Sequence, residues 1–191
     1  MFKPVKIISF YHNEKQLIKK AASGKRDAQQ YLYDKFAPKM LSVCRQYIKD
    51  VQFAEDVMVN GFVKVFKHLE SFKHEGSFEG WIRRIMIRES ISYLRKKQFV
   101  VFDNDIYERS NADSISISSS LDVEHIQMLI DDLPEGYKMV FVLYAVEGYK
   151  HAEIAEMLGI AESTSKSQLF KARRMLQEKL KKQNILGYGT H

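Results

Sequence analysis

The chain has 191 residues, of which 45% are hydrophobic and 28% charged, a balance that excludes disordered and membrane-embedded classes and fits one domain or two small ones. Its net charge of +6 favours a polyanionic partner, although an excess of lysine can also serve solubility alone. A single cysteine, Cys44, excludes an intrachain disulfide framework and a Cys-based zinc site, and it fits a reducing cytoplasm.

The N-terminal part predicts helices after a short extension. Residues 1–12 include an apolar run that is too short to span a membrane and lacks a cleavage site, so neither a signal peptide nor an anchor is expected. Asn13 is placed to cap a helix that ends near Gly24, and Asp27 to begin another. Pro38 predicts a kink or a restart in this second helix.

The segment from Phe53 to Phe72 repeats apolar residues at helical spacing, which predicts a helix with one buried side. The buried side is predicted to hold Val57, Phe62, Val65, Phe66 and Leu69, and the outer side Asp56, Asn60, Val63 and Lys67.

The segment 73–97 is a candidate nucleic-acid surface, because a short break precedes a strongly basic helix. Beyond Trp81 this helix has six basic residues and a single acidic one, Glu89. Phe72, Phe78 and Trp81 suit stacking on unpaired bases, but at helical spacing Phe78 and Trp81 suit a hydrophobic core equally well. The basic residues are Arg83, Arg84, Arg88, Arg95, Lys96 and Lys97, and the expected apolar side is Trp81, Ile82, Ile85, Ile91 and Leu94.

The composition changes abruptly after this helix. Between Gln98 and Glu124, six acidic residues accompany one basic residue, Arg109, and six serines occupy the second half. Such a segment has few large apolar residues to order it, so residues 98–121 are predicted to be a linker.

Residues 122–182 predict a second set of helices that ends in a helix-turn-helix. One helix ends before Pro134, and another, from Tyr137 to Val146, leads into the helix pair. Gly159 provides the backbone freedom for a sharp turn between the paired helices.

The last helix separates an inner stripe from a basic outer face. Ser165 places a hydroxyl on the inner stripe, where it needs a partner such as a carbonyl one turn back, and Ala161 stands where a capping residue is expected. The outer face suits a DNA major groove, and a solvated helical hairpin is the alternative. The inner stripe is Ser165, Leu169, Ala172 and Leu176; Ser163, Ser167, Phe170 and Arg174 face outward, flanked by Lys166, Lys171 and Arg173.

No pattern in the chain indicates catalysis. The six histidines are scattered without ligand spacing, and the phosphate-binding, dinucleotide-binding and nucleophile-elbow motifs are missing from the sequence. We therefore expect no enzyme activity, no metal and no cofactor. The predicted fold is all-α, with an extension (1–12), a helical domain (13–97), a flexible acidic linker (98–121), a second helical domain (122–182) and a tail (183–191).

Three segments in this order resemble the sigma-70 family of bacterial transcription initiation factors, specifically its extracytoplasmic-function group. The region that docks on the RNA polymerase clamp is similar to AQQYLYDKFAPKMLSVCRQY followed by FAEDVMVNGFVKVFKHL. The promoter-melting region is similar to FKHEGSFEGWIRRIMIRESISYLRKK, and the domain that reads the upstream promoter element is similar to LPEGYKMVFVLYAVEGYKHAEIAEMLGIAESTSKSQLFKARRML.

The resemblance implies a non-enzymatic cytoplasmic factor that binds the clamp and flap of core RNA polymerase, and promoter DNA. It also implies an anti-sigma partner, no membrane insertion, and strand separation aided by capture of an extruded base. Polymerase would contact Asp56, Asn60, Phe62, Val63 and Phe66; the downstream (−10) element would contact Lys73, His74, Gly76, Ser77, Phe78, Trp81, Arg84 and Arg88; and the upstream (−35) element would contact Ser163, Lys166, Ser167, Gln168, Phe170, Lys171, Arg173 and Arg174.

Several positions depart from the family's usual residues. Val59 and Asn60 stand where Gln-Glu is common, Arg88 replaces Asn, Gln168 replaces Arg, and Ser165 replaces Val. These departures bear on the polymerase contact and on the promoter sequence.

Two other classes of function fit parts of the chain. A conventional helix-turn-helix regulator would use only the C-terminal helix pair, dimerise on paired half-sites and need no polymerase. A protein adaptor would show no salt-dependent association with DNA. Both leave the aromatic and basic stretch before the linker unexplained.

Overall fold

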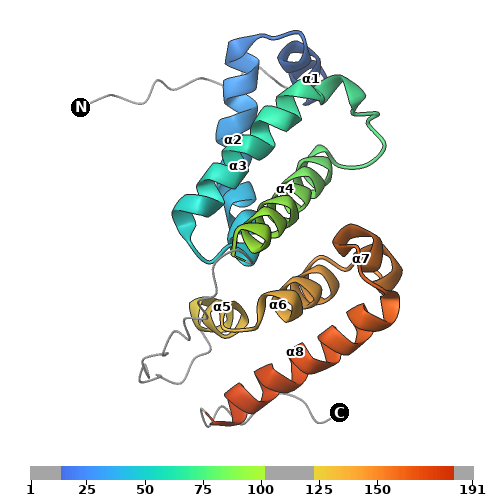
Figure 1. Cartoon of the computed structure of the whole chain (residues 1–191). Coiled ribbons are helices and arrows are strands. Elements are labelled where there is room, and N and C mark those ends of the chain that lie inside the picture. Colours follow the sequence, from blue (N-terminus) through green and yellow to red (C-terminus); the bar gives the residue numbers. More distant parts are fainter. Residues whose placement is uncertain (1–13, 102–122, 183–191) are drawn as a thin grey trace, which may run out of the picture. The chain divides into compact units, whose positions relative to one another are not determined.

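The computed structural model describes residues 14–101 and 123–182, and all the regular elements of these residues are helical (Figure 1). The prediction of an all-α fold is therefore confirmed. Four predicted features lie outside the described residues: the N-terminal extension, the Asn13 cap, most of the acidic linker and the C-terminal tail. The chain forms two compact units.

The described residues of the first unit, which ends at Tyr93, form three α-helices, a short 3-10 turn and most of a fourth α-helix. The last of these helices continues beyond residue 97, where the sequence analysis placed the start of the linker. The elements are α1 (Glu14–Ala22), α2 (Arg26–Tyr47), α3 (Val51–Lys67), η1 (Leu69–Ser71) and α4 (Phe78–Val101).

Of the kink or restart predicted at Pro38, the restart is wrong, because α2 runs through this residue without interruption. Pro38 lies on the exposed side, where the missing backbone N–H leaves no buried carbonyl behind. The Ser42 hydroxyl donates to the Pro38 carbonyl over 3.2 Å. Buried residues on both sides of Pro38, among them Phe36 and Met40, hold the two halves of the helix against the same core.

Gly61 of α3 lies against the end of the Met86 side chain of α4. A Cβ atom on Gly61 would lie 2.3 Å from Met86 Sδ, a contact that real Cβ atoms essentially never show. A larger residue at this position would therefore require the Met86 side chain to move. The surrounding core is apolar and includes Leu17, Leu32, Met40, Val43, Val65, Leu69, Ile82 and Ile87.

Cys44 lies inside this core, and burial raises the pKa of its thiol to about 11. Because the thiolate is the reactive form, we expect the folded protein to resist alkylation by iodoacetamide at mildly alkaline pH. Unfolding in urea should expose the thiol and restore a normal reaction rate, which mass spectrometry can follow. Rapid labelling without urea, in a sample whose helix content is intact, would contradict this burial.

The second unit is also helical, with one irregular turn. The helix predicted from Tyr137 to Val146 is an α-helix in its first half and a π-helical turn in its second. The elements are α5 (Val123–Asp131), α6 (Glu135–Phe141), η2 (Val142–Val146), α7 (His151–Leu158) and α8 (Glu162–Lys182).

A buried ion pair joins α5 to α6. The Lys138 ammonium lies 2.5 Å from the Asp131 carboxylate, and their side chains are only 6% and 2% exposed. The Gln127 amide also donates to Asp131, over 3.2 Å. Apolar residues that include Leu129, Val140, Leu143, Ile154 and Leu169 enclose the remaining core of this unit.

Candidate nucleic-acid interface

The loop between η1 and α4 has an unusual backbone. His74 has φ 57° and Gly76 has φ 103°, so two positions in three adopt positive φ. For a non-glycine residue this conformation costs about 1–2 kcal/mol, and such strain gathers at functional sites. The Ser77 hydroxyl then accepts a hydrogen bond from the Gly80 N–H over 3.0 Å, which fixes where α4 begins.

A cluster of aromatic rings packs beside this loop. The rings of Phe78 and Trp81 stack with centroids 5.8 Å apart, and Phe72 lies 5.1 Å from Phe78 and 5.5 Å from Trp81. Phe36 of α2 closes the cluster edge-on to Phe78, at 5.6 Å. The rings therefore join the loop, α2 and α4 into one rigid base.

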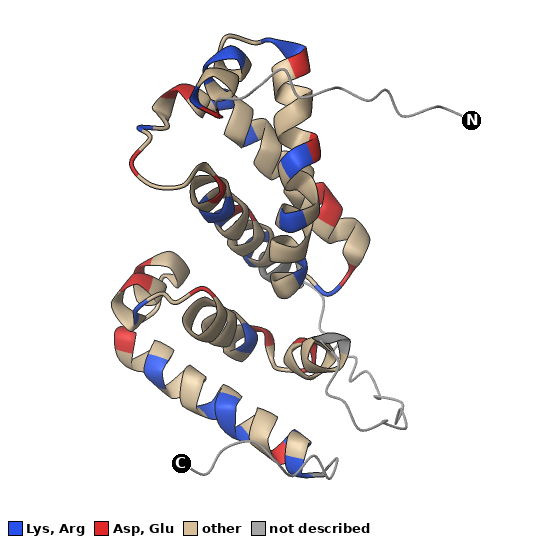
Figure 2. Ribbon diagram, turned by 180° about the vertical axis from the view of Figure 1, so that it is seen from behind, with Lys and Arg blue, Asp and Glu red and all other residues tan. Residues whose placement is uncertain are grey.

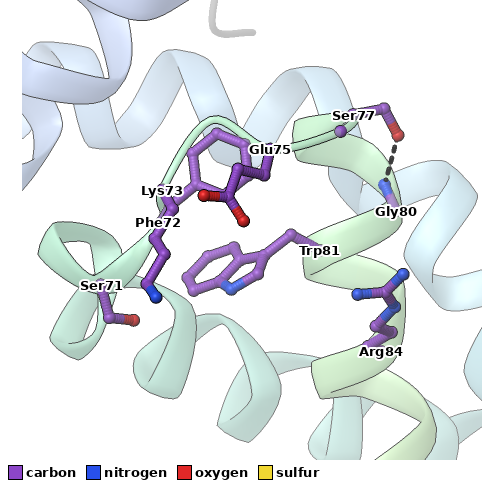
Figure 3. Close-up of a pocket in the computed structure, with 9 residues that line it drawn as sticks. Ser71, Phe72, Lys73, Glu75, Ser77, Gly80, Trp81 and Arg84 are labelled. Carbon is purple, nitrogen blue, oxygen red and sulfur yellow. Dashed lines mark hydrogen bonds between the residues drawn. The ribbon is translucent and has the colours of Figure 1, made fainter.

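A pocket of about 280 Å³ opens between this loop and the first turns of α4 (Figure 3). In this view the Trp81 indole lies between Lys73 and Arg84, with the Glu75 carboxylate facing it. An aromatic face flanked by cations is what a protein uses to hold an unpaired base and its phosphates. The lining residues are Ser71, Phe72, Lys73, Glu75, Gly76, Ser77, Gly80, Trp81 and Arg84.

Most of the residues expected to meet the downstream element gather at this pocket. Lys73, Gly76, Ser77, Trp81 and Arg84 line it, which the sequence pattern alone could not establish. His74 is exposed beside Phe72, with ring centroids 4.7 Å apart, and Arg88 is exposed further along α4.

Phe78 requires a correction. Its side chain is only 1% exposed and packs against Phe36, Phe72 and Trp81, so the expectation of a direct contact with DNA is wrong. It supports the pocket from inside the core. Ser71, Glu75 and Gly80 also line the pocket, although none was among the residues expected to contact the downstream element. For Glu75 the reason is that an acidic residue in a DNA-binding segment gives no signal of its own.

The outer side of α3 carries the residues expected to bind polymerase. Asp56 and Asn60 are exposed, and Val63 is 61% exposed. Phe62 is only 2% exposed and lies edge-on to Tyr33 at 4.8 Å, so the expectation that it contacts polymerase directly is wrong. Phe66 is half-buried beside it.

Val59 extends the exposed stripe. Its side chain is exposed and lies one helical turn before Val63, so an apolar strip crosses the outer side of α3. We define the α3 strip as Asp56, Val59, Asn60, Val63 and Phe66. Exposed apolar residues in a polar frame are typical of a surface that binds another protein.

The helix-turn-helix forms as expected from α7 and α8. Gly159 has φ 66° and ends α7, and the Ile160 N–H then donates to the Ala155 carbonyl over 3.0 Å. At the other end of α7, the Glu153 carboxylate accepts from the Lys150 backbone N–H over 2.8 Å. Both ends of the first helix of the pair are thus defined by local hydrogen bonds.

The outer face of α8 is exposed and basic. Phe170 is 69% exposed, and Figure 2 shows lysines and arginines recurring along this helix. Lys171 and Arg173 rest near the rings of Tyr137 and Tyr144, at 5.9 and 5.5 Å from the ring centroids, which limits their freedom. Exposed Ser163, Lys166, Ser167 and Arg174 complete the face.

Three side chains on this face have other partners. Lys166 pairs with Glu162 at 2.7 Å, which lowers the pKa of that carboxyl, and Arg174 pairs with Glu178 at 2.9 Å. Both pairs are exposed and one turn apart, so they are weak and can exchange for phosphate contacts. Gln168 is half-buried against Gly136 of α6 and is therefore less accessible than its neighbours.

Ser165 is fully buried on the inner stripe, but its partner differs from the one expected. A carbonyl one turn back was expected, whereas the Ser165 hydroxyl lies 2.9 Å from His151 Nδ1 on α7. The His151 ring in turn stacks on Tyr144, with centroids 4.6 Å apart. The bond therefore joins the two helices of the DNA-reading pair.

Replacing Ser165 with Val should lower the unfolding free energy of the second unit by about 1–3 kcal/mol, because His151 loses its hydrogen-bond partner. The double variant Ser165→Val with His151→Phe removes both polar groups and should recover most of that loss. Urea unfolding of the four proteins measures the coupling. Additive effects would show that the bond contributes nothing.

Within residues 14–101 and 123–182 there is no group of three or more His, Cys, Asp and Glu side chains that could hold a metal ion. The same residues include no helix that is both long and apolar enough to cross a membrane.

Comparison with known proteins assigns both units to one family. The family model described as sigma-70 region 2 matches residues 32–100, and the one described as sigma-70 region 4 matches residues 124–176. The first match includes the aromatic pocket and the α3 strip, and the second includes most of the helix-turn-helix.

Relatives match nearly the whole length. The chain is 27% identical over 180 residues to the ECF RNA polymerase sigma factor SigW of Bacillus subtilis (strain 168), covering 87% of this chain and 96% of the relative. It is 25% identical to the ECF RNA polymerase sigma-E factor of Haemophilus influenzae, covering 87% and 95%. A solved structure of the sigma factor RpoE in complex with the anti-sigma factor NepR, from Bartonella quintana, has the same fold, with a TM-score of 0.55. The two chains are 24% identical, and the match covers 80% of this chain and 96% of the other. The chain thus belongs to the extracytoplasmic-function group of the sigma-70 family.

Proposed function

We propose that this chain is a sigma factor that binds core RNA polymerase and directs it to start transcription at specific promoters. The observation that carries this proposal is the presence of both sigma-70 regions on one chain, in the family's order. Each region has a surface that suits nucleic acid. The first has an aromatic pocket with cations, and the second has a basic exposed helix.

The first unit would hold polymerase and the downstream element on different surfaces. The α3 strip would bind the polymerase clamp, where its exposed valines can lose water on contact. The pocket would take a base extruded from the downstream element. Stacking on an aromatic ring contributes about 1–3 kcal/mol per base, which offsets much of the unstacking cost and requires no ATP.

The second unit would read the upstream element. One face of α8 would enter the major groove, formed by Ser163, Lys166, Ser167, Phe170 and Lys171. The side chains of Lys171 and Arg173 are each oriented by a tyrosine ring. This unit would also meet the polymerase flap.

A regulator is part of the proposal. One solved relative is held in a complex with an anti-sigma factor, and we propose that an anti-sigma factor controls this chain too. Because core polymerase and the chromosome share the cytoplasm, we place the protein there.

The experiment combines the purified protein with bacterial core polymerase and fragmented genomic DNA. The sigma-factor function predicts salt-resistant binding to core polymerase, and initiation at sites that core polymerase alone does not use. Failure to bind core polymerase, or tight binding of the protein alone to palindromic sites, would contradict it and favour the conventional regulator.

Substitutions on α8 should separate promoter recognition from polymerase binding. Phe170→Ala or Lys171→Ala should weaken upstream-element binding by the holoenzyme about tenfold, because each removes a contact of about 1–3 kcal/mol. Affinity for core polymerase should stay the same, since the α3 strip lies in the other unit. Lys181→Ala, an exposed lysine at the end of the same helix, is the matched control. Equal loss of both activities would mean instead that the fold is damaged.

A further inference from the structure

Arg173 is held on the outer face of α8 by an aromatic ring and not by a carboxylate. Lys166 and Arg174 pair with glutamates of α8 itself, whereas Arg173 makes no ion pair with any residue that the structure describes. Its guanidinium lies over the Tyr144 ring, 5.5 Å from the centroid. A ring orients a cation without neutralising it, so the charge of Arg173 stays available to a phosphate.

Tyr144 lies outside the helix pair and is itself supported by a second ring. It is half-buried on η2, the π-helical turn before α7, and such turns are frequent at functional sites. The His151 ring of α7 stacks on it, with centroids 4.6 Å apart and planes 23° from parallel. The ring that carries Arg173 therefore has its position set by the first helix of the DNA-reading pair.

The contacts return to α8 through Ser165. This residue is fully buried, and its hydroxyl lies 2.9 Å from His151 Nδ1. Arg173 follows Ser165 on the same helix by about two turns. We define the Tyr144 network as Ser165, His151, Tyr144 and Arg173. It connects a buried bond between α7 and α8 to a cation on the DNA-facing side of α8.

We propose that Tyr144 is a positioning residue for the upstream element: it holds Arg173 toward one DNA phosphate, while His151 and Ser165 hold Tyr144 in place. The inference rests on the proposed function, because it requires α8 to lie in the major groove. Arg173 is on the flank of the outer face, which suits a phosphate beside the groove better than a base edge within it. A guanidinium that is ordered before DNA arrives loses less conformational entropy on binding.

A second pair of a cation and a ring provides a comparison within the same unit. Lys171 lies 5.9 Å from the centroid of Tyr137, which belongs to α6. Among the described residues, Tyr137 has no further ring contact or hydrogen bond, so it is not part of the Tyr144 network. Loss of the Tyr144 ring should therefore affect the contact made by Arg173 and spare the one made by Lys171.

The test measures how tightly holoenzyme, formed from the full chain and bacterial core polymerase, binds a promoter fragment found by mapping start sites. Tyr144→Leu should weaken binding about two- to fivefold, and Tyr144→Phe, which keeps the ring, should bind like the wild type. Each phosphate of the upstream element is then replaced in turn by a neutral methylphosphonate. The partner of Arg173 is the phosphate whose replacement weakens binding of the wild type but not of Arg173→Ala.

Tyr144→Leu should lose most of its sensitivity at this one phosphate and keep it at the others, which a general loss of stability would not produce. In the Arg173→Ala background, Tyr144→Leu should cost nothing more, whereas its effect should add to that of Lys171→Ala. Tyr137→Leu is the matched control and should show the reverse pattern. Urea unfolding checks that each variant is folded, and all of them should bind core polymerase equally.

His151→Ala provides an independent test, because it removes the supporting ring and leaves Tyr144 and Arg173 in the chain. It should reduce sensitivity at the same phosphate, and this prediction holds even if Tyr144→Leu does not fold. Normal sensitivity at that phosphate in the folded variants, or no phosphate that distinguishes the wild type from Arg173→Ala, would overturn the role of Tyr144 and leave the sigma-factor function intact. If the wild-type holoenzyme prefers no genomic fragment to unrelated DNA, the proposed function itself fails.

Discussion

Replacing Trp81 with Ala lowers promoter opening by the reconstituted polymerase about 10- to 100-fold, while affinity for core polymerase stays unchanged. The indole is the exposed end of the aromatic cluster and the only large ring among the described residues that both lines the pocket and remains half exposed. Its loss removes the stacking surface for an extruded base, a contribution of about 1–3 kcal/mol. Permanganate reactivity of unpaired thymines measures opening directly.

Two further measurements distinguish base capture from damage to the fold. Trp81→Phe keeps a ring at this position and should retain most of the opening activity, although it leaves a smaller stacking surface. A template with the downstream element already unpaired should rescue Trp81→Ala in part, because the unstacking cost is then removed. If Trp81→Phe fails as badly as Trp81→Ala, or if core binding is lost too, the residue acts through packing alone.

Lys138→Met should lower the unfolding free energy of the second unit by about 3–5 kcal/mol, which is most of what a helical unit of this size has. The substitution removes the Lys138 ammonium from the buried Asp131 carboxylate, which the Gln127 amide also contacts. Upstream-element recognition should collapse, whereas core binding through the first unit should persist. Urea unfolding followed by circular dichroism measures the loss.

The double variant Lys138→Met with Asp131→Leu tests the cause. Because both charges are then replaced by apolar groups, stability should return to near the wild-type value, as it does when buried ion pairs are replaced as a whole. A loss below about 1 kcal/mol in the single variant would show that water reaches the pair and that it holds α5 and α6 together only weakly.

Local patterns predicted the helices well because their periodicity reflects burial directly. On α8, the angular separation of Ser165 and Leu169 from Phe170 and Arg174 is also the separation of buried from exposed side chains. The restart that was one of the two alternatives at Pro38 does not occur, because a proline ends a helix only where the helix depends on its own hydrogen bonds. In α2, packing on both sides of Pro38 overrides the local preference.

The pocket was harder to predict from the sequence, because it depends on contacts between segments that are far apart along the chain. Phe78 and Trp81 lie three residues apart on one helix, yet the first is in the core and the second faces the pocket. That difference comes from Phe36, more than 40 residues earlier, which covers one ring and not the other. Likewise, the partner of Ser165 is His151 on another helix, and no local rule could name it.

Mapping transcription start sites with the reconstituted holoenzyme tests the central account most directly. Sites used only in the presence of this chain should share two sequence blocks at a nearly constant separation, one at the position of strand opening and one upstream. Lys171→Ala should weaken dependence on the upstream block alone, and Trp81→Ala should weaken opening at the downstream block alone. Start sites that share a single block or a palindrome, or that core polymerase uses equally well without the chain, would contradict the account.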